Sequence, residues 1–253
     1  SPVPQAALDD PATFLEQPIG NGPFQLDEAW QHNQYITCSR FEDYYGDAPA
    51  LDGIYYAIHN SPDTAFNEFE AGNLDFAQIP SGRIQQTIDE YGESDDGYTV
   101  TPGKQVLTGS QVSTYFIVLN TQDELLSNVD IRHAISLAIN RQNIVDSLFE
   151  GTREVADTIF PRAIDDDEED LWEYSTYDPE RAGQILDEAG YPLGDDGTRG
   201  LSVTLSYDTG RGHEDIMSSI QADLQEIGIE VAQDTAEWAV HLTKMREGSF
   251  QMG

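Results

Sequence analysis

Apolar positions recur with helical spacing along the second half of the chain. Residues 131–150 place Ile, Ala, Val, Leu and Phe side chains on one broad face, which predicts a single long helix that Gly151 ends. Shorter helices are expected over 179–189, 214–227 and 236–246. Alternating apolar and polar residues predict strands over 201–207 and 229–233. The β-α-β-α order of these elements favours an α/β layer.

Strand-like runs dominate the first part of the chain, although their alternation is only partial. Strands are predicted over 24–30, 34–41, 53–59, 74–79, 98–106 and 113–120. Helices are expected over 61–72, where Ser61 can cap the first turn and Pro62 can occupy it, and over 81–91. Residues 1–19 are rich in Pro and Ala and predict an extended lead-in with one short helical turn.

The charge balance excludes several classes of partner. The 253 residues include 47 Asp and Glu against 12 Lys and Arg, which gives a formal charge of −35. No basic stripe is available to neutralise phosphates, so nucleic acid is excluded, and anionic membrane surfaces are disfavoured. Aromatic residues make up 10% of the chain, so it can bury a core instead of behaving as a disordered acidic polymer. No apolar run approaches the 18 or so residues of a transmembrane helix.

Both ends of the chain suggest a piece of a longer protein. The first residues, SPVP, include no initiator Met, charged n-region or apolar h-region, so no signal peptide is expected within this chain. The last residues, GSFQMG, have the composition of the start of a strand.

Signatures of catalysis are sparse. Cys38 is the only cysteine and lies in a strand-like run, so an inert, half-buried thiol is expected. The five histidines provide no i, i+4 pair for zinc, and no P-loop or Gly-x-Ser-x-Gly motif is present. The acidic run at 165–170 lacks the spaced ligands of an EF-hand and is interpreted as a solvated loop. A hydrolase that uses two carboxylates across a cleft stays open as an alternative, because sequence cannot show their separation.

Several phrases, in one order, resemble those of a known family. They are GNGPF at 20–24 with Trp30 and YYG at 44–46, FEAGNLD at 69–75, LNT at 119–121 with VDIRHAISLAINR at 129–141, YDPERA at 177–182 with EAGY at 188–191, and ADLQEIGIEV at 222–231 with EW at 237–238. Together they resemble the family 5 extracellular solute-binding proteins, which are the peptide- and nickel-binding receptors of bacterial ABC importers.

The resemblance implies a fold and a division of the chain. The expected fold is α/β, the two-lobed type II fold of periplasmic binding proteins, present only as part of lobe one plus most of lobe two. The implied domains are a partial lobe one at 1–112, a hinge-crossing strand at 113–120, and lobe two at 121–253, truncated at the return to lobe one. The acidic residue with which members commonly bind a peptide α-amino group would then lie beyond residue 253.

The resemblance also implies a set of ligand-binding residues. His213 matches a pocket His of the oligopeptide-binding members, Trp238 matches a pocket-lining Trp, and Tyr207 and Arg211 are assigned as a wall and a charge partner. The expected set is Tyr207, Asp208, Arg211, His213, Trp238 and Asn120. Structural roles are the alternatives: His213 as an exposed residue at a helix N-terminus and Trp238 as core. No catalytic residue, metal site or cofactor is expected.

The implied function is capture, not turnover. The resemblance implies an extracytoplasmic receptor, in the periplasm or lipid-anchored at the outer face of the membrane, that delivers oligopeptides or dipeptides to ABC importer permease subunits. A monomer is expected, and the charge of −35 would steer cationic peptides. Nickel, heme or a sugar are alternative ligands, and an adhesion fragment without a ligand is a further alternative. With half the cleft absent, the isolated chain is expected to bind peptides weakly or not at all.

Overall fold

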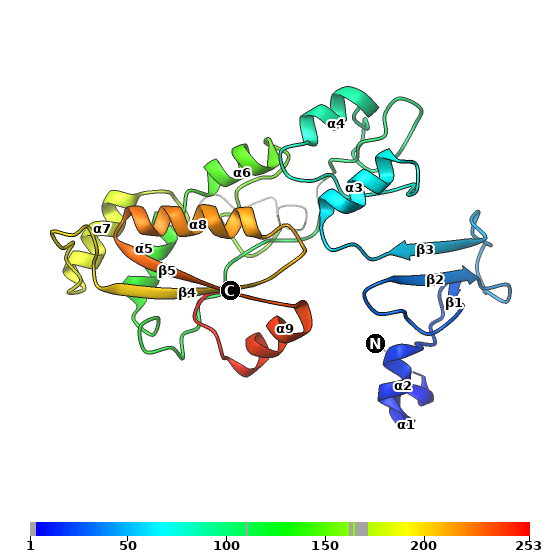
Figure 1. Ribbon diagram of the computed structural model, residues 1–253, viewed down its shortest axis with the longest axis horizontal. Helices are drawn as coiled ribbons and strands as arrows, with labels where there is room; N and C mark the ends of the chain where they lie inside the picture. Colours follow the sequence, from blue (N-terminus) through cyan, green and yellow to red (C-terminus); the bar gives the residue numbers. More distant parts are fainter. Residues whose placement is uncertain (1–3, 110, 162–163, 165–171) are drawn as a thin grey trace. The chain divides into compact units, whose positions relative to one another are not determined.

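The computed structural model describes residues 4–109, 111–161, 164 and 172–253 (Figure 1). The acidic run at 165–170 lies outside the described residues. The chain divides into two compact units, Ser1–Asn60 and Ser61–Gly253, which are described separately. The lobe boundaries implied by the family resemblance therefore stay a prediction.

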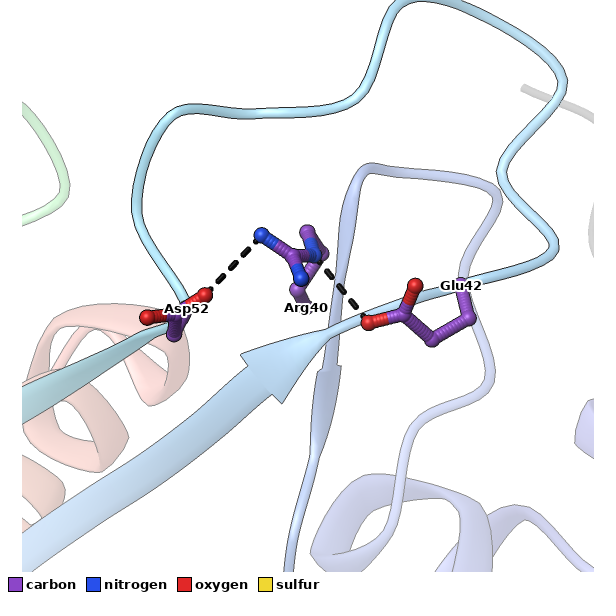
Figure 2. A network of polar contacts seen from close by, with 3 residues as sticks. All are labelled: Arg40, Glu42 and Asp52. Atoms are coloured by element: carbon purple, nitrogen blue, oxygen red, sulfur yellow. Dashed lines mark hydrogen bonds and ion pairs between the residues drawn. The ribbon is translucent and has the colours of Figure 1, made fainter.

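The first unit contains a three-stranded antiparallel sheet. Strands β1 (Phe24–Leu26), β2 (Tyr35–Arg40) and β3 (Gly53–Ala57) lie in that order, with Cys38 opposite both Leu26 and Ile54. All three predicted strands are therefore present, although shorter than expected. Figure 2 shows how Arg40 joins the ends of β2 and β3: its guanidinium contacts Glu42 at 3.1 Å and Asp52 at 3.0 Å.

The lead-in to this sheet is more helical than predicted. It contains α1 (Gln5–Asp9) and α2 (Pro11–Glu16) where a single turn was expected. Asp10 explains the second helix, because its side chain accepts a hydrogen bond from the Thr13 amide while Pro11 occupies the first turn.

Burial raises the pKa of the Cys38 thiol, which agrees with an inert cysteine.

The second unit is an α/β layer built on a parallel pair of strands. Its elements are α3 (Pro62–Glu70), α4 (Ile84–Tyr91), α5 (Val129–Ala138), α6 (Arg141–Phe149), α7 (Pro179–Glu188), β4 (Leu201–Asp208), α8 (Glu214–Glu226), β5 (Ile229–Ala236) and α9 (Trp238–Glu247). Strands β4 and β5 pair from Leu201 opposite Ile229 to Asp208 opposite Ala236. Helix α8 packs on β5, and α9 lies on the opposite side of the strand pair from α8 (Figure 1). Apolar residues of α5, α7, β4, α8 and β5 form one continuous core.

Two short segments extend this sheet beyond β4. Met252 pairs with β4 in parallel, since Ser206 donates its amide to Met252 O at 2.8 Å and Met252 donates to Thr204 O at 3.1 Å. On its other side the 251–253 segment pairs antiparallel with 118–120, where Val118 and Gly253 exchange hydrogen bonds of 2.7 and 3.0 Å. The order of paired segments is therefore β5, β4, 251–253 and 118–120.

The prediction of a single helix over 131–150 is wrong, because the helix is interrupted between α5 and α6. Ile139 is extended, and the Asn140 side chain caps α6 by accepting from the Asn143 amide at 3.0 Å. The Arg141 guanidinium turns back and donates to Ser136 O at 2.8 Å, and Asp223 accepts from the Asn140 amide. Side-chain hydrogen bonds thus offer this backbone an alternative to continuing the helix.

Three other predicted strands are not formed as strands in the described residues. Residues 74–79 make no bridge, residues 98–106 make isolated bridges from Thr101 to Lys104 and from Val106 to Glu93, and only 118–120 of the 113–120 segment pairs. A strand needs a neighbouring backbone to complete its hydrogen bonds, and apolar alternation alone does not supply one. In the described part of the chain, no helix is long and apolar enough to cross a membrane.

Candidate functional site

The candidate site begins where β4 ends. Parallel strands direct their carboxyl ends to one edge of a sheet, and β4 and β5 end there at Asp208 and Ala236, tied together by a hydrogen bond of 3.0 Å from the Thr209 amide to Ala236 O. The loop 209–213 then leads into α8. Gly210 and Gly212 have φ of 84° and 77°, which suits glycine and lets the loop turn sharply.

Asp208 lies beneath this loop and contacts two of its side chains. The residue is only 2% exposed. Its Oδ1 lies 3.2 Å from His213 Nδ1, and its Oδ2 lies 3.0 Å from Arg211 Nε. The Arg211 N–H is not directed at Oδ2, so this oxygen is close to a positive charge yet accepts no hydrogen bond from the described residues. Asp208 is therefore held by charge more than by aligned hydrogen bonds.

Each of the two side chains that Asp208 contacts also meets an aromatic ring. Arg211 lies over Trp238, the first residue of α9, with its guanidinium carbon 4.2 Å from the ring centroid. His213 meets Tyr115 edge to face at 5.5 Å between centroids. Trp238 is 43% exposed, so its ring covers the loop without being core. The structure thus brings four of the expected residues together: Asp208, Arg211, His213 and Trp238.

The other two expected residues lie elsewhere. The Tyr207 ring belongs to the core, and its hydroxyl donates to Gln233 Oε1 at 2.8 Å. Asn120 uses its amide nitrogen to donate to Gly248 O at 3.0 Å and to Phe250 O at 2.7 Å. Asn120 therefore fixes the segment that leads to Met252. Ligand-binding roles for both residues stay predictions.

A groove of about 270 Å³ lies alongside the loop. It is lined by Pro62, Asp63, Gln78, Pro80, Ser81, Tyr115, Phe149, Arg153, Arg211, Gly212, His213, Asp215 and Ile216. Sequence reasoning missed Tyr115 and Arg153, because they are distant from the loop along the chain and no motif surrounds them. The only available signal was the position of Tyr115 in the segment 113–120, which was expected to lie at a lobe junction.

Partial burial shifts the pKa values of two side chains that line this groove. Burial, with the Asp208 charge as the second cause, raises the pKa of Tyr115 to about 12. Burial also lowers the pKa of Arg153, whose guanidinium carbon lies 3.6 Å from the centroid of the Phe149 ring. Both shifts disfavour the charged form, as expected where protein surrounds a side chain that still reaches solvent.

The chemistry of the groove suits non-covalent binding. Arg153, Arg211 and the Tyr115 hydroxyl offer hydrogen-bond donors, and the aromatic rings offer apolar walls, which is the composition of many small-ligand sites. No group of three His, Cys, Asp or Glu side chains that could hold a metal ion occurs among the residues that the structure describes.

Comparison with known proteins extends this description. The whole chain, residues 1–253, matches the family model described as bacterial extracellular solute-binding proteins, family 5 middle. The nickel-binding periplasmic protein of Escherichia coli K12 is 29% identical over 245 residues, which cover 94% of this chain and 45% of that protein. The oligopeptide-binding protein AppA of Bacillus subtilis is 28% identical over 258 residues, which cover 96% of this chain and 44% of AppA. The chain therefore spans about half the length of the curated relatives it matches.

A solved structure agrees with these matches. AppA of Bacillus subtilis in complex with a nonapeptide superimposes with a TM-score of 0.77 at 29% sequence identity, covering 99% of this chain and 49% of the AppA chain. The expected α/β fold of periplasmic binding proteins, present in part, is thereby confirmed.

Proposed function

We propose, from the premise that this chain belongs to the family 5 bacterial extracellular solute-binding proteins, that its protein captures oligopeptides for an ABC importer. The residues described here supply one wall of the binding cleft. Delivery to permease subunits, a monomeric state and an extracytoplasmic location, in the periplasm or lipid-anchored, belong to the same proposal. The lobes would be residues 1–112 and 121–253, connected by 113–120. No step of this function requires covalent chemistry.

The observation that supports this proposal is the groove at the carboxyl end of β4. Arg211, His213 and Trp238 come from a loop and a helix start that the sheet holds in place, and Tyr115 faces them from a separate segment. Peptide backbones present carbonyl oxygens and a terminal carboxylate, and the N–H and O–H groups of these side chains can donate hydrogen bonds to both. The match to a relative whose structure holds a nonapeptide points to the same ligand class.

Nickel is the second candidate ligand. The Escherichia coli nickel-binding relative is as similar in sequence as AppA, at 29% against 28% identity. Among the described residues no His, Cys, Asp and Glu group is arranged to bind a metal directly. We therefore rank peptides first and use nickel as a competing arm of the test.

The test is a thermal-shift screen of the full-length protein that carries this sequence. The probes are a mixed oligopeptide panel, a dipeptide panel, nickel, heme and a neutral sugar. A ligand at 100 times its dissociation constant stabilises the protein by about 2.7 kcal/mol. Arg211→Gln should weaken the peptide response, whereas Arg246→Gln, on the exposed last turn of α9, should leave it unchanged.

Two results decide the assignment. Stabilisation by peptides that Arg211→Gln weakens supports the peptide receptor and this wall of the cleft. A response to nickel, heme or the sugar with none to either peptide panel overturns the peptide assignment. The same screen on residues 1–253 alone should show little or no peptide response, because the chain spans about half of its relatives.

A further inference from the structure

Asp208 differs from the other acidic side chains that the structure describes. Among the described residues it is the one fully buried acid, at 2% exposure, in a chain with 47 acidic residues. Burial of a charge is costly unless hydrogen bonds and an opposite charge compensate for it. Here one oxygen accepts no hydrogen bond from the described residues, and such a buried, unsatisfied atom calls for an explanation other than stability alone.

The contacts of Asp208 lead directly to the groove. The residue itself is absent from the groove lining, but both side chains that it contacts, Arg211 and His213, are part of that lining. Through them the carboxylate is connected to two aromatic walls. Arg211 lies over Trp238 on one side, and His213 meets Tyr115 on the other.

We propose that Asp208 is a positioning residue of this groove, whose buried negative charge holds Arg211 against Trp238 and His213 against Tyr115 before a ligand arrives. This inference rests on the proposed binding function and adds to it how the wall is kept in shape. Arg211 is flanked by Gly210 and Gly212, which restrict the backbone less than other residues would, so side-chain contacts are needed to fix the direction of Arg211 and His213. An ordered donor set binds more tightly because less side-chain freedom is lost on binding.

The exposure of Arg211 predicts an unusual effect of substituting Asp208 on thermal stability. Removing one member of a buried ion pair is usually destabilising because the other charge stays buried and unpaired. Here the charge that remains is on Arg211, whose side chain is 52% exposed and can be hydrated. Asp208→Asn keeps the shape and removes the poorly compensated charge. Its midpoint of thermal unfolding should therefore stay the same or rise, while ligand affinity falls.

The first measurement needs no ligand. In the full-length protein, Trp30→Phe and Trp172→Phe remove the other two tryptophans of this sequence, and any Trp outside it is replaced likewise. Acrylamide quenching of the remaining fluorescence then measures how far Arg211 shields the Trp238 ring from solvent. Asp208→Asn should increase quenching to the level of Arg211→Met. Asp223→Asn, which changes a part-buried carboxylate next to α6, should not change it.

The second measurement is the affinity for a peptide that the thermal-shift screen selects. Asp208→Asn should weaken binding about tenfold or more, with unfolding unchanged or shifted upward. The proposal is overturned if Trp238 quenching does not change, if affinity is unaffected, or if the variant loses stability and affinity together as a purely structural residue would. If no peptide binds even the unmodified protein, the proposed function fails. The quenching experiment still decides, separately, whether Asp208 positions Arg211.

Discussion

Substitution of Gly228 by Ala tests how tightly the second unit is packed at the end of α8. It follows α8, has φ of 84°, and accepts the Arg199 amide hydrogen bond at 2.9 Å. A Cβ on this residue would lie 2.6 Å from Leu193 Cδ1 and 3.1 Å from Gly197 O. Gly228→Ala therefore combines a left-handed backbone, at about 1–2 kcal/mol, with overpacking at the lower end of its range, about 1 kcal/mol, because the exposed Leu193 side chain can move while the Gly197 carbonyl cannot move as easily. We expect a loss of about 2–3 kcal/mol in the free energy of unfolding.

Gly190 provides the matched control. It follows α7 in the same unit and has φ of 91°, but a Cβ there would meet no atom within 4 Å. Gly190→Ala should therefore lose only the backbone contribution, about 1–2 kcal/mol. Urea unfolding followed by circular dichroism measures both losses. Equal losses for the two variants would refute the argument that Leu193 and Gly197 confine Gly228.

Three further changes test the charges of the second unit. Burial raises the pKa of Asp223 above 3.8, so ionisation of this carboxyl lowers the free energy of unfolding as the pH rises from 3.8 through the folded-state pKa. The unfolding free energy of Asp223→Asn at pH 7 should therefore equal or exceed that of the wild type. Urea titrations should show this difference shrinking as the pH falls toward 4. The hydrogen bond from Lys244 lowers the pKa of Asp234, so this pair stabilises the fold above pH 3.8 and stops doing so as the pH falls through the lowered value. Lys244→Met should therefore lose less than about 1 kcal/mol at pH 7, and the loss should fade in acid. Arg141→Met leaves the Ser136 carbonyl, in the last turn of α5, without its side-chain donor and should lose about 1–3 kcal/mol in urea unfolding, whereas an exposed Arg246→Met should lose almost nothing.

Local sequence signals predicted most of the elements because their causes are local. The Ser61 side chain, expected to cap α3, accepts from the Thr64 amide, and Asp178 caps α7 in the same way by accepting from the Arg181 amide, so each cap lies within a turn of the helix start that it specifies. The break at Asn140 was missed because apolar spacing continues through it, while the stop depends on a hydrogen bond that Arg141 donates to Ser136 O and on one that Asp223 accepts from the Asn140 amide. The strand expected at 74–79 failed because no neighbouring backbone pairs with it among the described residues.

The candidate site was predictable to a similar extent. The loop after β4 could be identified because a strand followed by glycines and a helix defines a carboxyl edge. The facing residues Tyr115 and Arg153 could not, since only the folded chain brings Tyr115 to His213 and Arg153 to the same groove. The burial of Asp208 was likewise invisible in the sequence, where it is one acid among 47.

The pairing of Met252 between β4 and Leu119 has a consequence for synthesis in the cell. Leu119 and Met252 are 133 positions apart (252 − 119), and β4 lies between them in the sequence. During translation β4 therefore leaves the ribosome well before the segment that covers its outer edge. Until residue 252 is made, that edge exposes unpaired amides and carbonyls, which can recruit strands from other nascent chains. Slow translation through 209–252 should therefore increase aggregation, and a chaperone that shields open sheet edges should reduce it.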